Sequence, residues 1–331
     1  MDGRYSGLLL RTLSGLFIAL TVGAGGGVAW FLLRYPRVAS PNPVLIHVTA
    51  ALIERGRYLA NHVAVCMDCH STRDWDAFSG PIVPGTEGAG GQRFGKELGL
   101  PGTFYAANIT PAGLSQWSDG EILRAITGGV TRRGRAMFPV MPYPRYRALS
   151  ETDAEAIVAY IRTLTPVARE IRPSQLDFPM NVLVRTLPEP FVPRPPPDRS
   201  SPVAYGRYLT TIAGCSACHT RSERGKPIQG MEYAGGAAFD VPRAGRVQSA
   251  NITPDSDTGI GDWPRAFFVA RFRDPTSAGT RRLLPRDRRL NTIMPWTMFA
   301  GMTDEDLGAI YAYLRTVRPV RNQVARFSGA S

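Results

Sequence analysis

CMDCH at residues 66–70 and CSACH at residues 215–219 are two copies of one motif, Cys-x-x-Cys-His. Together they contain every cysteine of the 331-residue chain: Cys66, Cys69, Cys215 and Cys218. Two cysteines three positions apart lie on one helical turn, where they can form thioethers to the two vinyl groups of a haem. The adjacent imidazole then lies under the iron. The motifs therefore predict two covalently bound haem c groups, with His70 and His219 as iron ligands.

Paired cysteines also occur in zinc sites, in redox-active dithiols and in structural disulfides. A zinc site would need four ligands from these two clusters. A thioredoxin-like motif needs no histidine after the second cysteine, and it expects a βαβ pattern that the surrounding sequence does not show. Covalent haem attachment accounts for the cysteines and the histidine together, so we follow that interpretation.

The sequence around the two motifs repeats, which indicates two copies of one domain. Three segments recur in the same order: GRYL at 56–59 and 206–209, ANITP at 107–111 and 250–254, and AYIRT at 159–163 with AYLRT at 312–316. We predict haem domains over residues 48–171 and 203–320. A chain of 331 residues with 44% hydrophobic content suits two domains that each bury a core.

Helix-start signals predict that each domain is all-α. Ser118 and Glu121 form a capping-box pattern, and Ser150 and Thr303 stand at similar starts before two closing helices. The closing helices carry apolar residues three and four positions apart, on a face that would pack against the first helix of the same domain. These residues are Ile157, Tyr160 and Ile161, and Ile310, Tyr313 and Leu314.

Residues 12–33 run without a charge and are long enough to cross a hydrocarbon layer of about 30 Å as a helix. Arginines lie on both sides of this stretch, so the positive-inside rule alone is indecisive. Haem c is attached outside the bacterial inner membrane, which predicts a cytoplasmic N-terminus, an anchor within residues 1–37 and periplasmic haem domains. The alternative is a cleaved signal peptide, with small residues at 22–24 as the cleavage site.

Residues 172–202 contain nine prolines and separate the two predicted domains. Clustered prolines favour the polyproline II conformation, which acts as a semi-rigid spacer. We expect a Pro-rich linker that limits the relative orientations of the two haem domains.

A haem iron held by one histidine needs a sixth ligand or keeps an open site. The spare histidines, His47 and His62, both precede the first motif, and we expect His62 to be a surface or packing residue. Met141 and Met294 each stand 19 residues before the tyrosine of a closing helix, and each begins a Met-Pro-aromatic triplet. Because proline fixes φ, the loop that carries the thioether is stiff. We predict Met141 and Met294 as distal iron ligands; the alternative is that they are core residues.

The formal net charge of +12 points to an anionic partner. Arginines precede both predicted methionine ligands: Arg132, Arg133 and Arg135, and Arg281, Arg282, Arg286, Arg288 and Arg289. They would steer an acidic redox partner to a haem edge, pair with haem propionates, or form a solvated loop. Asn108 and Asn251, in the repeated ANITP segments, would contact propionates or stabilise a turn. No nucleic-acid recognition motif accompanies the charge.

Taken together, GRYL, Cys-x-x-Cys-His, NITP, Met-Pro-aromatic and AY(I/L)R resemble a known family over about residues 48–320. The family is the membrane-anchored multi-haem cytochrome c subunits of bacterial periplasmic dehydrogenases for alcohols, sugars, sugar acids and aldehydes. The resemblance implies a class I cytochrome c fold in each domain, with iron held by His70 and Met141 and by His219 and Met294. It also implies electron transfer from a dehydrogenase to quinone or a terminal oxidase. Many such subunits have three haem motifs, whereas this chain has two.

These expectations describe a di-haem electron-transfer subunit with no substrate chemistry of its own. Matched methionines argue against a di-haem peroxidase, which needs one haem with an open or removable distal ligand. A haem subunit of a terminal oxidase or of a quinol-oxidising complex shares the same chemistry and differs only in its partner. The expected partners are the membrane and a redox protein, which is a dehydrogenase, an oxidase or a quinol-oxidising complex.

Overall fold

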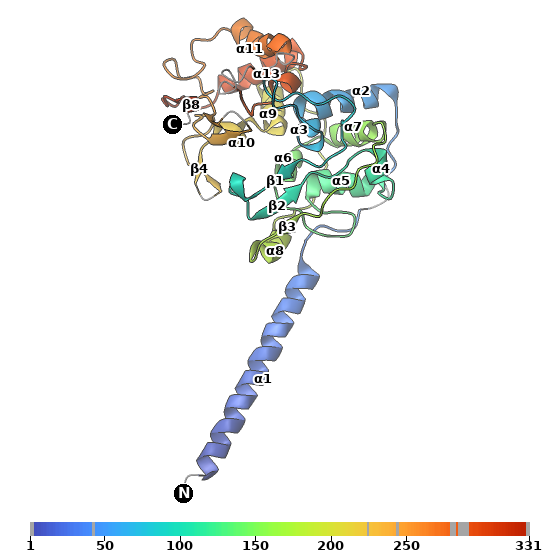
Figure 1. Cartoon of the computed structure of the whole chain (residues 1–331), viewed down its shortest axis with the longest axis vertical. Helices are drawn as coiled ribbons and strands as arrows, with labels where there is room; N and C mark the ends of the chain where they lie inside the picture. The colour runs from blue at the N-terminus through green and yellow to red at the C-terminus, as the bar shows by residue number, and fades with distance from the viewer. Residues whose placement is uncertain are drawn as a thin grey trace.

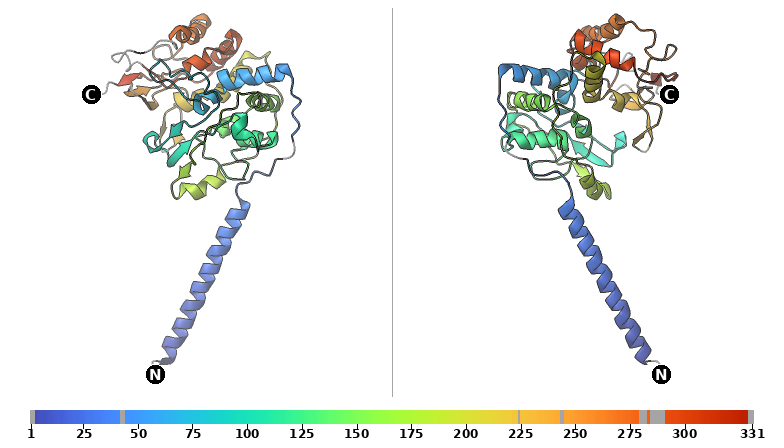
Figure 2. Two further views of the ribbon diagram at one scale, coloured as in Figure 1. Left: turned by 45° about the vertical axis from the view of Figure 1, so that its right-hand side comes forward. Right: turned by 180° about the vertical axis from the view of Figure 1, so that it is seen from behind.

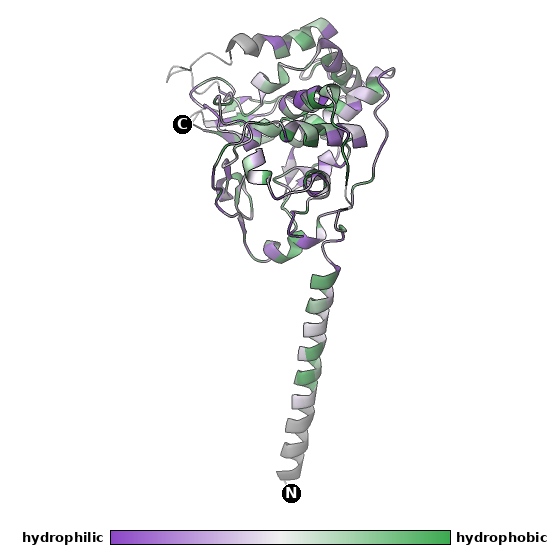
Figure 3. Cartoon of the chain, turned by 90° about the vertical axis from the view of Figure 1, so that its right-hand side faces the viewer, coloured by the Kyte–Doolittle hydropathy of each residue, from purple (hydrophilic) through white to green (hydrophobic). Residues whose placement is uncertain are grey.

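The computed structural model describes residues 3–41, 44–223, 225–242, 245–278, 283 and 291–328. A single long helix, α1 (Gly3–Arg34), projects from a globular part that contains all the other elements (Figure 1). Within the described part of the chain, α1 is the one helix long and apolar enough to cross a membrane, with a mean hydropathy of 2.0 over Leu13–Arg34. Its upper part is coloured hydrophobic to neutral in Figure 3. The predicted apolar helix is therefore confirmed. Its length and composition are those of a membrane span, and signal sequences share them.

Each GRYL segment lies on a helix that crosses a closing helix. In the half that contains the first Cys-x-x-Cys-His motif, called the first half below, α2 (Ala50–Tyr58) continues into a π-helical turn (Leu59–Val63). It crosses α7 (Glu151–Ile161). In the second half, α9 (Pro202–Ala213) crosses α13 (Asp304–Leu314) in the same way.

A glycine makes each crossing possible. A Cβ added to Gly56 would overlap the Ala156 carbonyl, and a Cβ added to Gly206 would overlap the Ala309 carbonyl. The helix backbones therefore touch at these points, and only glycine leaves room for them.

The predicted helix starts are confirmed. Ser118 and Glu121 form a complete capping box at α5 (Asp119–Gly128). The Ser150 hydroxyl accepts a hydrogen bond from the Asp153 backbone, and the Thr303 hydroxyl accepts one from the Asp306 backbone, both at 3.1 Å. The apolar stripes of the closing helices pack into the core as expected.

Apart from α11, the remaining elements are short. The helices are α3 (Cys66–His70), α4 (Pro111–Leu114), α6 (Tyr143–Tyr146), α8 (Met180–Leu183), α10 (Cys215–His219) and α12 (Trp296–Phe299), with the longer α11 (Arg265–Ala278). Two 3-10 turns cover Lys96–Leu98 and Val184–Thr186.

The all-α expectation holds for the core but not for the loops, which form short antiparallel strands. One sheet has the order β1 (Arg93–Phe94), β2 (Gly102–Tyr105) and β3 (Gln175–Leu176). A hairpin joins β4 (Ser222–Glu223) to β5 (Lys226–Pro227). A further sheet has the order β6 (Ala238–Val241), β7 (Gly245–Gln248) and β8 (Phe327–Ser328), so residues after 320 pair with a strand of the second half.

The predicted Pro-rich linker is only partly irregular. Its first part contains β3, α8 and a 3-10 turn, and Gln175 in β3 pairs with Thr103 in β2 of the first half. Further along, the Glu151 backbone donates to the Arg194 carbonyl at 3.0 Å. The segment therefore packs along the first half.

Two tyrosines join the halves directly and in matching ways. The Tyr58 hydroxyl donates to the Asp306 carboxylate at 2.6 Å and accepts from the Thr303 backbone at 3.2 Å. In return, the Tyr208 hydroxyl donates to the Asp153 carboxylate at 2.6 Å and accepts from the Ser150 backbone at 3.2 Å. Each GRYL tyrosine thus caps the closing helix of the other half, and Figure 2 shows the halves packed side by side.

Replacing Gly206 with alanine is expected to lower the free energy of unfolding by about 1–3 kcal/mol, because the new Cβ forces α9 and α13 apart. Urea titration followed by circular dichroism measures the change. Gly128→Ala is the matched control, since its Cβ would meet its nearest neighbour at an ordinary 3.4 Å. Equal stability of the two variants would contradict the close crossing.

Candidate functional site

Each Cys-x-x-Cys-His motif forms one helical turn that begins after a left-handed residue. Val65, with φ of 48°, precedes α3, and Gly214, with φ of 72°, precedes α10. The turn starts at the first cysteine in both halves. The four cysteines are not paired with one another in the structure.

The two motif histidines are held in the same tautomer. The Nδ1–H group of His70 donates to the Ala107 carbonyl, and that of His219 donates to the Ala250 carbonyl, both at 2.7 Å. Burial lowers the pKa of each imidazole, which favours its neutral form. A neutral ring that donates from Nδ1 leaves the Nε2 lone pair for a metal. The carbonyl partners come from the repeated ANITP segments.

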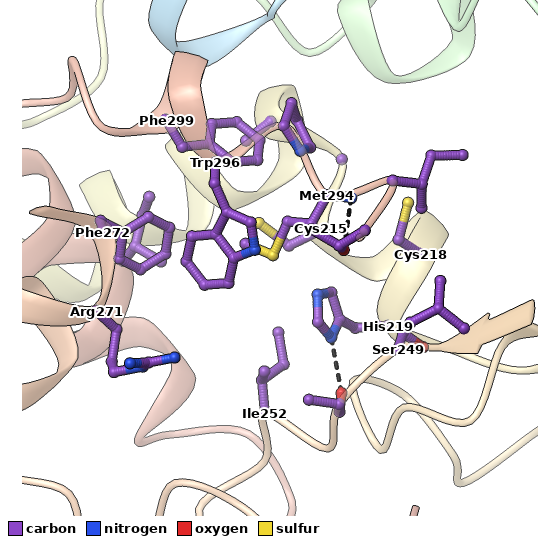
Figure 4. A pocket seen from close by; sticks show the side chains of 18 of the residues that line it. Cys215, Cys218, His219, Ser249, Ile252, Arg271, Phe272, Met294, Trp296 and Phe299 are labelled. Atoms are coloured by element: carbon purple, nitrogen blue, oxygen red, sulfur yellow. Dashed lines mark hydrogen bonds between the residues drawn. The ribbon is translucent and has the colours of Figure 1, made fainter. Parts of the chain in front are cut away.

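In the second half, the predicted ligands line one cavity of about 490 Å³. Cys215, Cys218 and His219 enter it from α10, and Met294 enters it from the loop before α12 (Figure 4). The remaining lining is mainly apolar and aromatic, including Ile252, Phe272, Trp296 and Phe299. A cavity of this volume, with two thiols, one imidazole and one thioether, fits a covalently attached haem.

The two Met-Pro-aromatic triplets have the same backbone conformation. The Tyr143 backbone donates to the Met141 carbonyl at 2.7 Å, and the Trp296 backbone donates to the Met294 carbonyl at 2.8 Å. With φ near −80° and ψ of 46° and 61°, the prolines between them form inverse γ-turns. The expected stiff loop is therefore present at both positions.

Arg145 lies between the two motifs. It stands in α6 of the first half, yet it lines the cavity of the second half together with Val65 and Asp68. A Cβ added to Gly214 would overlap its guanidinium, and its buried Nε has no hydrogen-bond partner among the described residues. This cation was not anticipated from the sequence.

The positive charge of Arg145 influences the pKa of the thiols in both cysteine pairs. Burial raises the pKa of all four thiols, to about 12 for Cys66, Cys69 and Cys215, and Arg145 opposes that rise at each of them. One buried positive charge is therefore shared by the two motifs.

Asn108 and Asn251 stabilise turns. Each side-chain oxygen accepts from the backbone and hydroxyl of a threonine two residues later, at 2.7–3.0 Å. The amide of Asn108 donates to the Val167 and Arg169 carbonyls, and that of Asn251 donates to the Val320 carbonyl and to Thr258. These contacts favour the turn interpretation over contact with propionates.

The other predicted residues are placed only in part. Arg132 is half-exposed and lies 3.5 Å from Glu121. The second arginine cluster lies outside the described residues: Arg281, Arg282, Arg286, Arg288 and Arg289. His62 packs between the halves, where its Nδ1 lies 2.8 Å from the Met298 carbonyl, as expected of a packing residue. His47 is exposed.

Two further residues beside the cavity of the second half were not predicted from the sequence. Ser79 and Asn291 are both buried and contact each other across the two halves. Neither belongs to a repeated segment, so nothing in the sequence pattern distinguishes them from ordinary loop residues.

Among known protein families, residues 203–318 match the family model described as Cytochrome c. The chain is 29% identical to the gluconate 2-dehydrogenase cytochrome c subunit of Pantoea cypripedii over 81% of this chain and 60% of that subunit. It is 27% identical to the cytochrome c subunit of the quinone-dependent alcohol dehydrogenase of Gluconacetobacter polyoxogenes, over 82% of this chain and 57% of that subunit. It is also 27% identical to a diheme cytochrome c-type protein of Cereibacter sphaeroides, over 92% of this chain and 97% of that protein.

The chain spans less than two thirds of the length of the first two of these relatives. Even so, the matched descriptions agree with the resemblance drawn from the motifs, which is confirmed.

Proposed function

We propose, from the premise that this chain is a relative of dehydrogenase cytochrome c subunits with a cytochrome c domain over residues 203–318, that it is a di-haem electron-transfer protein. Haem iron, when bound, supplies a one-electron Fe(III)/Fe(II) couple. The observation that carries the proposal is the cavity that Cys215, Cys218, His219 and Met294 line together, because these residues would supply both thioethers and both iron ligands of one haem.

We extend the assignment to the first half, so that the chain holds two tandem class I cytochrome c domains. The support is the repeated geometry: a glycine-centred helix crossing, a histidine held through Nδ1, and an inverse γ-turn after a methionine. His70 with Met141 and His219 with Met294 would hold the two irons, and the four cysteines would form the thioethers.

Methionine at both distal positions favours electron transfer over substrate chemistry. A methionine ligand closes the iron site and stabilises Fe(II), which suits an electron carrier. A di-haem peroxidase would need one open or removable distal position, whereas the Met141 and Met294 turns share one backbone conformation. The redox partner we favour is a dehydrogenase, as for the relatives, with an oxidase or a quinol-oxidising complex as the alternative.

We further propose that α1 anchors the protein in the bacterial inner membrane and that the haem domains lie in the periplasm. The apolar length of α1 supports the anchor. The Arg185 guanidinium donates to the Leu32 carbonyl at 2.8 Å and to the Tyr35 carbonyl at 2.5 Å. The first half is thus seated on the end of α1, next to where the membrane surface would be. Purification from native membranes, followed by identification of the co-purifying proteins, tests both the location and the partner.

Mass spectrometry of the intact denatured protein is expected to give the polypeptide mass plus two haems, because each motif can form both thioethers. Haem staining after denaturing electrophoresis should agree. The double variant Cys215→Ala/Cys218→Ala should keep one covalent haem, and so should Cys66→Ala/Cys69→Ala. A wild-type mass with one haem or none would overturn the di-haem assignment.

A further inference from the structure

The loop that follows the first motif reaches across to the methionine turn of the second half. Residues 71–83 leave α3 and fold back on themselves, with a bridge between Arg73 and Ile82. Ser79, near the tip, is fully buried and has a φ of 62°. A serine in the left-handed region carries a conformational cost, so the surrounding contacts must hold it there.

The Ser79 hydroxyl contacts both ends of the Met294 turn. Its Oγ donates to the Met294 carbonyl at 2.7 Å and accepts from the Trp296 backbone at 3.0 Å. These two backbone groups are the ends of the inverse γ-turn that holds Met294 at the cavity. A side chain of the first half therefore closes the loop that would carry the distal ligand of the second haem.

Asn291 makes a second connection between the same two segments. Its side-chain oxygen accepts from the Ser79 backbone at 2.7 Å. Its amide donates to the Trp75 carbonyl at 3.2 Å and to the Ala77 carbonyl at 3.3 Å. Asn291 is 1% exposed, so water does not compete for these bonds.

On its other side, Ser79 connects to the first motif through Arg73. The Arg73 guanidinium donates to the Ser79 carbonyl at 2.5 Å and to the Gly80 carbonyl at 2.6 Å. It also forms an ion pair with the Asp68 carboxylate at 2.5 Å. A continuous set of contacts thus runs from the first Cys-x-x-Cys-His motif to the Met294 turn.

We propose that Ser79 is a positioning residue that holds Met294 on the iron of the second haem from within the first haem domain. The inference rests on the proposed ligation by Met294. The segment after Met141 has a contact of another kind, within its own half, where the Tyr146 hydroxyl donates to the Ala64 carbonyl at 2.7 Å. Loss of the Ser79 hydroxyl should therefore weaken ligation at the second haem and leave the first unchanged.

Ser79→Gly is the decisive variant, because glycine adopts the left-handed conformation without cost and loses only the side chain. In the purified full-length holoprotein, the near-infrared Met–iron band is expected to fall toward half its wild-type intensity. One haem per chain should also become able to bind carbon monoxide in the ferrous state, and its midpoint potential should fall. Met141→His and Met294→His, measured in parallel, identify which haem has changed.

Ser150→Ala is the matched control. Ser150 is an equally buried serine that caps α7 and does not contact the Met294 turn, so its loss destabilises the fold without touching the ligand loop. Its Met–iron band and both potentials should match the wild type. Unchanged spectra and potentials in Ser79→Gly, or a change at the first haem, would overturn the proposed role of Ser79. If Met294→His itself left the band intact, the ligand assignment would fail instead.

Discussion

Replacing Met294 with histidine is expected to lower the midpoint potential of one haem only and to halve the near-infrared Met–iron band. A thioether stabilises Fe(II) relative to an imidazole, so exchanging the ligand favours Fe(III). The fall should be on the order of 100 mV, within the span of roughly 0.8 V that axial ligands cover. Met141→His should act in the same way on the other haem, and the double variant should lose the band entirely. A spectroelectrochemical titration measures both quantities.

The controls for this experiment come from neighbouring methionines. Met302 also lines the cavity of the second half and is 2% exposed, so it is the competing candidate for the same iron. Met302→Leu, Met298→Leu and Met137→Leu should keep the full band and both potentials. If Met302→Leu removed half of the band while Met294→His did not, the distal ligand would be Met302.

Replacing Arg145 with glutamine is expected to lower the midpoint potentials of both haems together. Its guanidinium acts to lower the pKa of all four motif cysteines, and it lies against Gly214 of the other half. A buried positive charge disfavours the more positive Fe(III) state. At a distance of about 10 Å and an effective dielectric constant of about 20, the interaction between two unit charges is about 1.7 kcal/mol. For a one-electron couple this corresponds to about 70 mV.

Two variants separate charge from packing at this position. Arg145→Lys keeps the charge and should leave both potentials near the wild-type values. Arg147→Gln removes a positive charge two residues away, where the guanidinium pairs with the exposed Glu189, and solvent should screen its effect on the haems. A fall confined to one haem would show that Arg145 is not shared between the two sites.

Much of the candidate site was predictable because the relevant signals are local or repeated. The Cys-x-x-Cys-His spacing needs only one helical turn, and the Met-Pro-aromatic triplets need only one γ-turn. The repeat supplied the register that singled out Met141 and Met294 among nine methionines. The cap serines and the apolar stripes of the closing helices are also readable from spacing of three or four residues.

The errors arose where distant segments override local preference. The proline-rich stretch after residue 172 predicts a semi-rigid linker and gives no sign of β3, which pairs with β2 because a strand edge offers hydrogen-bond partners that proline content does not reveal. The short strands of the loops have two to four residues each, too few for an alternating pattern to be visible.

By itself, the sequence determined the number of motifs, the order of the repeated segments, the helices that carry them and the methionines matched to each, because these depend on residues close together along the chain. The tertiary structure alone decided how the halves meet: the exchange of tyrosines between closing helices, the shared Arg145, and the contact of Ser79 with the Met294 turn. Ser79 and Met294 are 215 residues apart, and their hydrogen bond exists only because both segments pack at one interface. Such contacts follow from the packing of whole surfaces and leave no periodic trace in the sequence.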